Sequence, residues 1–371
     1  MTDPVVIAGA GIAGCALALA LQRAGVRSVV CEAHPGDGRE AGAFLALGSS
    51  GVRALRAVGA DDAVAAVSEP ITTIRRLDAA EATAGTRPLA ADGAPGYRLL
   101  TRGALAGALA GRAAERGLEV RYAAGVTAAE PDGSGVTVTL RDGATVRGSL
   151  LVGADGLHSV VRALVDPGGS GPRPVGQRVY YGATPGRLLG AAGEFLVQPT
   201  PTGAFGAFPR EDRTWWFLRR DVDDPATPPD QDPGTVLLGH VTPGGAAARA
   251  VREATEIVAF DAYDLPHVGA WYRDAMLVTG DAAHAASPAT GQGASMALED
   301  VVVLAKALRD HDDVGAAAAA YERARRGRTQ ANVVASAAMS RPDRPPTDAD
   351  PGERLSDEAL LAQLDWDIPQ A

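Results

Sequence analysis

The sequence predicts an α/β fold in which a parallel-sheet domain is interleaved with a mixed, largely antiparallel β-sheet domain. Three observations support this. A glycine-rich turn joins an apolar strand to a helix within residues 5–21. Apolar strand segments occur at 149–154, closed by Asp155-Gly156, and at 276–279, before a stretch rich in Gly, Ala and Ser. Residues 176–268 contain short strands broken by proline and glycine, which is typical of an antiparallel sheet.

Composition restricts the class of protein. A chain of 371 residues can form one large domain or two interleaved ones. The net charge of −10 disfavours a nucleic-acid partner or an anionic membrane surface. Two cysteines make no disulfide framework, no apolar run reaches the length of a membrane span, and the first residues lack the basic character of a secretory signal. We therefore expect a cytoplasmic protein with a small-molecule substrate.

The chain begins with "VVIAGAGIAGCALALALQRAGVRSVVCEA", which predicts a strand, a glycine turn, a helix and a second strand. Gly9, Gly11 and Gly14 form a G-x-G-x-x-G pattern. The first glycine permits a tight turn, the second lets a pyrophosphate approach the backbone, and the third lets the helix pack closely on the strand. Free amides at the helix N-terminus favour an anion. Glu32, about 20 residues further on, is placed to bind a ribose hydroxyl, so the pattern predicts a Rossmann-type dinucleotide site.

After Glu32 the chain departs from a simple nicotinamide dehydrogenase. It continues with a turn, an extended stretch, a short helix around 52–58 and a longer helix from about 103 to 116. A β-meander with turns at "PDGSG" and "RDG" follows, and then the apolar strand "SLLVGA". A meander between parallel strands is not expected in a doubly wound dehydrogenase. The choice between NAD and FAD therefore depends on the motifs further along.

Three motifs occur in a fixed order: the fingerprint at 9–14, "LLVGADGLHSVVR" at 150–162, and "GDAAHAASPATGQGASMALEDVVVLAKAL" at 280–308. In this order and spacing they resemble the single-component FAD-dependent monooxygenases, the aromatic hydroxylases whose type member is p-hydroxybenzoate hydroxylase. The resemblance covers about 1–175 and 268–335 and is weakest in the middle. It implies a discontinuous FAD-binding domain of the glutathione-reductase-like type (1–70, 101–175 and 269–335), a substrate-binding domain (71–100 and 176–268), and a C-terminal tail with a short helix (336–371).

The same resemblance implies where FAD binds. Asp281 would approach the ribitol and pyrophosphate, and Pro288 would lie near the face of the isoalloxazine ring. Amides at the start of the following helix would point at the pyrimidine edge, where reduced flavin carries negative charge. Many relatives have asparagine where Ser295 stands, but serine can still cap the helix. The cofactor-binding candidates are Gly9, Gly11, Ile12, Ala13, Gly14, Glu32, Ala33, Arg39, Arg102, Val126, Asp155, Asp281, Pro288, Gly291, Gln292, Gly293, Ala294 and Ser295.

Two of these candidates, Arg102 and Asp155, have alternative interpretations. Arg102, in "TRGAL", is either beside the FAD or a solvated arginine at a helix start. The resemblance implies that Arg39 meets the flavin or the nicotinamide donor. Asp155, before Gly156, is either a contact to FAD and NADPH or part of a turn after a strand. Val126 would offer backbone groups to the adenine.

No catalytic side chain is assigned, because in this family the flavin carries the chemistry. His284 is common at its position in the family, but no acid or nucleophile stands at triad spacing, so packing under the loop is the favoured interpretation. The other histidines, at 34, 158, 240, 267 and 311, form no metal-ligand spacing, and no metal is expected.

The middle of the chain supplies the substrate-pocket candidates Tyr180, Tyr181, Phe195, Phe205, Phe208, Trp215 and Trp216. Because side chains alternate between the two faces of a strand, only half of them can face a ligand. The last amphipathic segment, "LSDEALLAQLDWD", either docks on the surface or caps the pocket.

The function implied is an oxidoreductase that uses NADPH or NADH and O2 to hydroxylate or otherwise oxygenate a bulky hydrophobic, aromatic or polycyclic natural product through a flavin C4a-hydroperoxide. The alternative is a redox-neutral cyclisation or rearrangement in the same biosynthetic setting. A halogenase is disfavoured, because the chain has no W-x-W-x-I-P stretch and its single lysine is Lys306.

The fingerprint makes a first prediction. The purified protein should be yellow, with about one FAD per chain, and Gly11→Val should abolish flavin binding because the added side chain occupies the approach of the pyrophosphate. Flavin absorbance per mole of protein measures this. Stoichiometric flavin in the variant would contradict the proposed site.

Overall fold

A six-stranded, mainly parallel sheet forms the centre of the molecule in the computed structural model, which describes residues 3–36, 43–89, 95–222, 232–340 and 356–370. Its strands lie in the order β18 (Tyr272–Arg273), β19 (Met276–Val278), β12 (Leu150–Gly153), β1 (Val5–Ala8), β2 (Ser28–Cys31) and β8 (Glu119–Arg121). β1 pairs in parallel with both β2 and β12, and only β18 runs antiparallel to its neighbour. The apolar segments of the sequence are therefore buried parallel strands, as expected.

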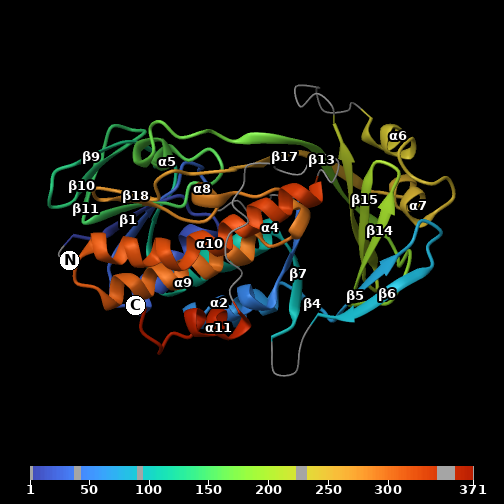
Figure 1. Cartoon of the computed structure of the whole chain (residues 1–371), viewed down its shortest axis with the longest axis horizontal. Helices are drawn as coiled ribbons and strands as arrows, with labels where there is room; N and C mark the ends of the chain where they lie inside the picture. Colours follow the sequence, from blue (N-terminus) through green and yellow to red (C-terminus); the bar gives the residue numbers. More distant parts are fainter. Residues whose placement is uncertain (1–2, 37–42, 90–94, 223–231, 341–355, 371) are drawn as a thin grey trace.

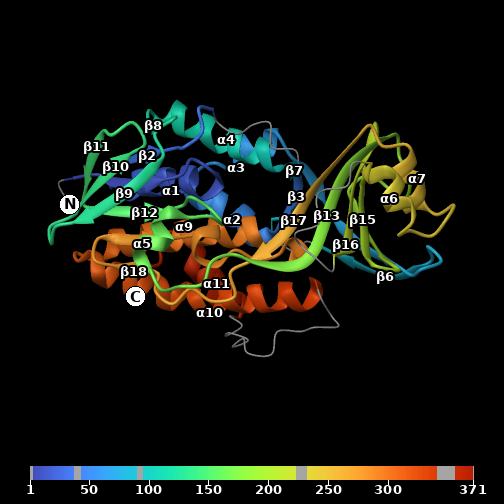
Figure 2. The same ribbon diagram turned by 90° about the horizontal axis from the view of Figure 1, so that it is seen from above.

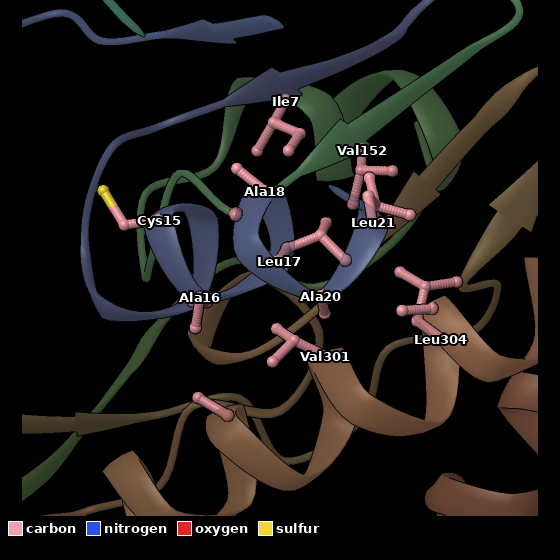
Figure 3. Close-up of a cluster of buried hydrophobic side chains, with 14 of the residues drawn as sticks. Ile7, Cys15, Ala16, Leu17, Ala18, Ala20, Leu21, Val152, Val301 and Leu304 are labelled. Atoms are coloured by element: carbon pink, nitrogen blue, oxygen red, sulfur yellow. The ribbon is translucent and has the colours of Figure 1, made fainter. Parts of the chain in front are cut away.

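Helix α1 (Ile12–Arg23) lies between this sheet and helix α9 (Gly293–Asp310). Figure 3 shows Leu17 of α1 near Val301 of α9, with Ile7 and Val152 from the strands on the other side of α1. The stretch 13–21 of α1 is buried, because its small residues allow both neighbours to approach. Helix α10 (Val314–Ser340) packs against α9, and helix α4 (Arg102–Glu115) packs against α1.

The expected meander is present as β9 (Val126–Pro131), β10 (Val136–Leu140) and β11 (Thr145–Gly148), which pair antiparallel. Its turns contain Gly133 and Gly143, both with the positive φ that glycine tolerates without strain. The chain then enters β12 and the short helix α5 (Val160–Val165).

A second, seven-stranded sheet lies at the other end of the molecule (Figure 1). Its order is β17 (Glu256–Asp264), β13 (Arg173–Pro185), β16 (Arg213–Asp221), β15 (Gly203–Pro209), β14 (Glu194–Thr200), β5 (Thr73–Leu77) and β6 (Thr83–Pro88). All pairs are antiparallel except β14 with β5. Figure 2 shows the long strands β13 and β17 running from the first part of the molecule into this sheet. This is the mixed, largely antiparallel sheet that the sequence predicts.

The outer face of the seven-stranded sheet is covered by helices α6 (Pro233–Leu238) and α7 (Ala246–Arg252). Trp216 is fully buried there, and its Nε1 donates to Thr184 Oγ1 at 3.0 Å. Gly182 makes room for this ring, because a Cβ at that position would lie 2.2 Å from the indole. The inner face of the seven-stranded sheet is turned toward the part of the molecule that contains the six-stranded sheet.

A three-stranded sheet of β3 (Phe44–Leu47), β7 (Tyr97–Thr101) and β4 (Glu69–Ile71) lies between the two larger sheets in the views of Figures 1 and 2. The remaining elements are the helices α2 (Ser49–Val58), α3 (Asp61–Ala66) and α8 (Asp281–His284), and a 3-10 turn, η1 (Pro288–Thr290). Among the described residues, none of the helices has the length and apolar character needed to cross a bilayer.

The C-terminal helix α11 (Asp357–Leu364) docks on α2 and α9 and contributes no side chain to the large cavity described below. Lys306 of α9 is fully buried, and its Nζ donates to the carbonyl oxygens of Ala362, Gln363 and Asp365 at 3.4, 2.9 and 2.6 Å. The single lysine of the chain thus satisfies the open carbonyls at the end of α11, where a cation is favoured. The guanidinium groups of Arg23 and Arg309 lie over the Trp366 ring, 4.6 and 5.1 Å from its centroid.

Lys306→Met should therefore release α11 without disturbing the core. Methionine keeps most of the apolar stem, but three carbonyls lose a charged donor, and we expect a loss of about 2 kcal/mol in the docking of the tail. Hydrogen exchange of residues 357–364 measures the effect. Arg323→Met, at an exposed position of α10, is the matched control and should leave the exchange unchanged. Equal protection of α11 in both variants would contradict the capping role.

Candidate active site

The carboxyl ends of four neighbouring strands meet at one edge of the six-stranded sheet. Gly9 N donates to Cys31 O at 2.8 Å, Ala154 N to Ala8 O at 2.9 Å, and Thr279 N to Gly153 O at 2.9 Å. A cavity of about 780 Å³ opens at this edge and continues to the inner face of the seven-stranded sheet. Ligands of open α/β sheets bind outside the carboxyl ends of the strands, so the topology places a site here.

The three fingerprint glycines have different surroundings. Gly9 has φ +98°, and a Cβ there would lie 2.6 Å from Ala154 O. A Cβ on Gly14 would lie 1.8 Å from Gly9 O, so α1 can lie this close to the loop only with glycine at that position. A Cβ on Gly11 would meet nothing within 4 Å, because Gly11 faces the cavity. The open space over Gly11, in front of the N-terminus of α1, fits a pyrophosphate.

Glu32 lies at the end of β2 and lines the cavity. Its Oε2 accepts from Ala10 N at 2.6 Å, and its Oε1 accepts from His34 N at 2.8 Å. The carboxylate therefore also fixes the glycine loop, a contact that the fingerprint alone did not reveal. Ala33, Gly125 and Val126 line the same end of the cavity, which is the end expected to hold the adenosine.

Asp155 lines the cavity, but its carboxylate also caps α5. Oδ1 accepts from Ser159 Oγ at 2.5 Å and Oδ2 accepts from Val160 N at 2.8 Å. Gly156 follows with φ +76°, so Asp155 and Gly156 form a turn after the strand, which was one of the two interpretations. Both residues also line the cavity. Buried Arg162 joins this segment to α8, because its guanidinium donates to Leu157 O at 2.8 Å and to Ala282 O at 3.2 Å.

The stretch 280–295 crosses the cavity as a thin wall. Gly280 adopts φ +60°, and Asp281 opens α8 with its carboxylate 3.9 Å from the guanidinium of Arg102. Both of these side chains line the cavity, as do residues 286–294. Helix α9 begins at Gly293, so its first amides face the same space. An 18-residue helix whose N-terminus faces a cavity favours an anionic group there.

Ser295 does not line the cavity. It is fully buried, and its Oγ accepts from Gly48 N at 3.0 Å, at the N-terminus of α2. The serine thus joins α9 to α2, whereas the sequence interpretation placed it among the groups around the flavin.

A buried network of charges supports this wall from beneath (the Asp300 network: His284, Glu299, Asp300 and Arg325). Asp300 Oδ2 lies 2.5 Å from His284 Nε2 and accepts from Gly280 N at 3.1 Å, while Oδ1 accepts from Arg325 Nε at 2.7 Å. Arg325 Nη2 also donates to Glu299 Oε2 at 2.7 Å. His284 is therefore packed under the loop, which is the interpretation that the sequence favoured.

Electrostatic interactions favour the charged forms of Asp300 and Arg325 in this network. Burial raises the pKa of the Asp300 carboxyl, but His284 and Arg325 outweigh it and hold the pKa below its usual range. Burial lowers the pKa of Arg325, yet Glu299 and Asp300 together raise it above its ordinary value. Removal of one partner would leave an uncompensated buried charge, which is strongly destabilising.

The cavity brings together most of the cofactor-binding candidates. Those that line it are Gly9, Gly11, Ile12, Ala13, Glu32, Ala33, Arg102, Val126, Asp155, Asp281, Pro288, Gly291, Gln292, Gly293 and Ala294. Gly14 lies behind the glycine loop and Ser295 lies under α9. Arg39 falls outside the described residues.

Among the aromatic candidates, Tyr181, Phe195 and Phe208 line the cavity, whereas Tyr180, Phe205 and Trp216 are buried on the outer face against α6 and α7. Trp215 faces inward but lines a smaller adjacent cavity of about 340 Å³. The apolar wall of the cavity consists of Tyr181, Phe195 and Phe208 together with three residues that were not candidates: Phe44, Ile74 and Phe217. Strand alternation could have identified Phe217, because it shares a face with Trp215, but Phe44 follows a loop with no periodic pattern.

Residues 2–336 match the profile of a family described as "FAD binding domain". The chain is 32% identical over 347 residues to the aurachin C monooxygenase/isomerase of Stigmatella aurantiaca, a match that covers 90% of this chain and 87% of that protein. It is 30% identical over 361 residues to the phenazine 1,6-dicarboxylic acid hydroxylase PhzS of Lysobacter antibioticus, covering 90% and 88%. The chain belongs to the FAD-dependent monooxygenases.

Solved structures show the same fold. HpxO of Klebsiella pneumoniae, complexed with FAD and uric acid, superimposes with a TM-score of 0.82 at 23% identity, covering 91% of this chain and 88% of that one. The match to the FAD-binding family over residues 2–336 shows that FAD is the cofactor of this monooxygenase, and the resemblance drawn from the three motifs is confirmed.

In this monooxygenase, Glu32 should contribute to FAD binding in two ways, through the ribose and through the glycine loop. Glu32→Ala should raise the dissociation constant of FAD about 10- to 100-fold, on the scale of a hydrogen bond to a charged group. Fluorescence titration of the apoprotein with FAD measures this. Glu130→Ala, at an exposed position of β9, removes the same charge elsewhere and should change nothing. Equal FAD affinity in the two variants would remove Glu32 from the site.

Proposed function

We propose that this monooxygenase uses NADPH or NADH and O2 to hydroxylate or otherwise oxygenate a bulky aromatic or polycyclic natural product. The observation that carries the proposal is a single cavity of about 780 Å³ that joins the glycine loop to an aromatic wall. The wall is apolar with few polar groups, as is usual where a small organic molecule binds. The names of relatives that act on aurachin C, phenazine 1,6-dicarboxylic acid and 3-amino-4-hydroxybenzoate support an aromatic substrate.

The residues divide the cavity into two ends. At one end, the glycine loop would hold the pyrophosphate, Glu32 the ribose, and the backbone of Val126 the adenine. Beyond them, Asp281 would bind the ribitol and the amides at the start of α9 would face the pyrimidine edge of the flavin. The aromatic wall forms the other end, so a substrate held there would lie against the isoalloxazine ring.

Bound flavin supplies the redox chemistry, the transfer of electrons from the nicotinamide donor and the activation of O2. The chain supplies position and exclusion of water. The rings of Phe195 and Phe208 stack with centroids 4.3 Å apart, and the ring of Phe44 meets Phe208 and Tyr181 edge-on at 5.3 Å. Such a wall desolvates the reacting centre, which protects it from unproductive reaction with water.

One observation favours a second candidate function. The relative at 32% identity is named as an isomerase as well as a monooxygenase, so a redox-neutral rearrangement could accompany or replace oxygenation. The two functions differ in stoichiometry. An oxygenase consumes one NADPH and one O2 per product, whereas a rearrangement alone consumes neither.

Asp281→Ala tests the proposed arrangement. The fold should survive, because buried cores lie on both sides of the loop, but FAD should be lost or held in a shifted position. Where flavin remains, NADPH oxidation should slow and more hydrogen peroxide should form per product, because a small displacement of reacting groups is costly. FAD content, NADPH consumption and peroxide are measured on the same preparation.

Asp312→Ala is the control, because Asp312 is an exposed carboxylate outside the cavity. It should behave as the wild type in all three measurements. Wild-type values for Asp281→Ala as well would mean that residues 280–295 do not hold the flavin.

A further inference from the structure

A partly buried arginine, Arg219, lies within the apolar wall of the cavity, which Arg87 and Arg102 also line. Arg219 lies on β16, two residues after Phe217, and so shares its inward face. Its Nε and Nη1 are shielded from solvent and have no hydrogen-bond partner among the described residues. The ring centroid of Phe217 lies 5.6 Å from its guanidinium carbon. That contact covers one face of the guanidinium but accepts none of the N–H groups in its plane.

The charge of Arg219 is also poorly compensated by the protein. Within the part of the chain that the structure describes, the carboxylate that acts on it is Asp221, two residues further along the strand and exposed. An oxygen of Asp221 instead accepts from Gln177 Nε2 at 3.4 Å. Burial lowers the pKa of Arg219, but an arginine remains charged in proteins. Buried polar groups are normally paired, so an unpaired guanidinium in a cavity calls for a ligand that pairs with it.

Tyr181 adds a second polar group at the same place. In the β13–β16 ladder, Tyr181 is opposite Phe217 and Val179 is opposite Arg219, so Tyr181 and Arg219 are diagonal neighbours on the inward face. Burial raises the pKa of the Tyr181 phenol, which therefore stays protonated at neutral pH and can donate a hydrogen bond. A cation and a neutral phenol side by side form a site for an oxygen that carries negative charge.

We propose that Arg219, assisted by Tyr181, binds an acidic oxygen of the substrate. The substrate is then an aromatic compound with a carboxylate, or an ionised phenol or enol, rather than a wholly apolar molecule. This inference rests on the proposed function and narrows its substrate class. The planar guanidinium fork suits a carboxylate, which it can bind through two parallel hydrogen bonds, while the aromatic wall takes the ring system.

The acidic oxygen could also come from the phosphates of the nicotinamide donor, and the experiment separates the two sources. FAD-loaded wild type, Arg219→Met and Arg213→Met are titrated by calorimetry with two matched probe pairs, 2-naphthoate with 2-naphthamide and benzoate with benzamide. Arg213 is the control because it lies on the same strand, exposed and outside the cavity. The KM for NADPH and the FAD content are measured on each preparation.

We expect the wild type and Arg213→Met to bind at least one carboxylate about tenfold more tightly than its amide, the scale of a charged hydrogen bond. Arg219→Met should lose this preference, to within about twofold, with the affinity for the amides, the FAD content and the KM for NADPH unchanged. Arg219→Lys should retain part of the preference, because it keeps the charge without the fork.

Three results would overturn the inference. One is a wild type with no preference for either carboxylate, including no measurable binding. Another is an Arg219→Met variant that keeps the preference. The third is a variant whose KM for NADPH rises while its carboxylate preference stays, which would assign Arg219 to the donor. Failure of the wild type to bind FAD or to oxidise NADPH would instead contradict the proposed function, so the two failures are distinguishable.

Discussion

The Asp300 carboxylate is the constraint on which the site depends. It joins the turn after β19, through Gly280 N and His284, to Arg325 on α10, and it is itself part of α9. Three segments distant in sequence therefore share one buried charge network. The wall of residues 280–295 contains few large side chains and cannot hold its own shape by packing. Its backbone is fixed instead by directional contacts from beneath, and the face toward the cavity remains free for a ligand.

The other two sequence motifs join the same construction. Arg162 ties the segment after β12 to Ala282, and Ala154 N pairs with Ala8 O beside the glycine loop. The fingerprint, the 150–162 motif and the 280–308 motif thus contact one another through backbone hydrogen bonds and one buried arginine. A parallel sheet makes this possible, because the carboxyl ends of its strands meet at one edge whatever their order in the chain.

The sequence predicted those features whose cause is local. The meander followed from its turn residues, and α2 and α4 formed within a few residues of their expected positions, because turn chemistry and apolar spacing act over short distances. Contacts that depend on the tertiary fold could not be anticipated. Examples are Ser295 bonding to Gly48, Glu32 holding Ala10, and Lys306 capping α11. For the aromatic segment, strand alternation predicted that only half of the candidate side chains can face inward. It could not predict which half, because the face of each strand that is turned toward the cavity is set by the whole sheet.

The two faces of the seven-stranded sheet have a consequence for how such an enzyme can diversify. Side chains on the outer face, such as Tyr180 and Trp216, pack against α6 and α7. Side chains on the inner face, such as Tyr181 and Phe217, line the cavity and would contact a molecule bound there. Selection for a new substrate can therefore act on every second residue of a strand. The residues between them are constrained instead by the stability of the fold. Gly206 sets a limit, since a side chain there would collide with the Phe217 ring at 2.2 Å. The repertoire of accessible substrates is thus bounded by a few small residues in the sheet, and the mutational paths between substrates run along one face of it.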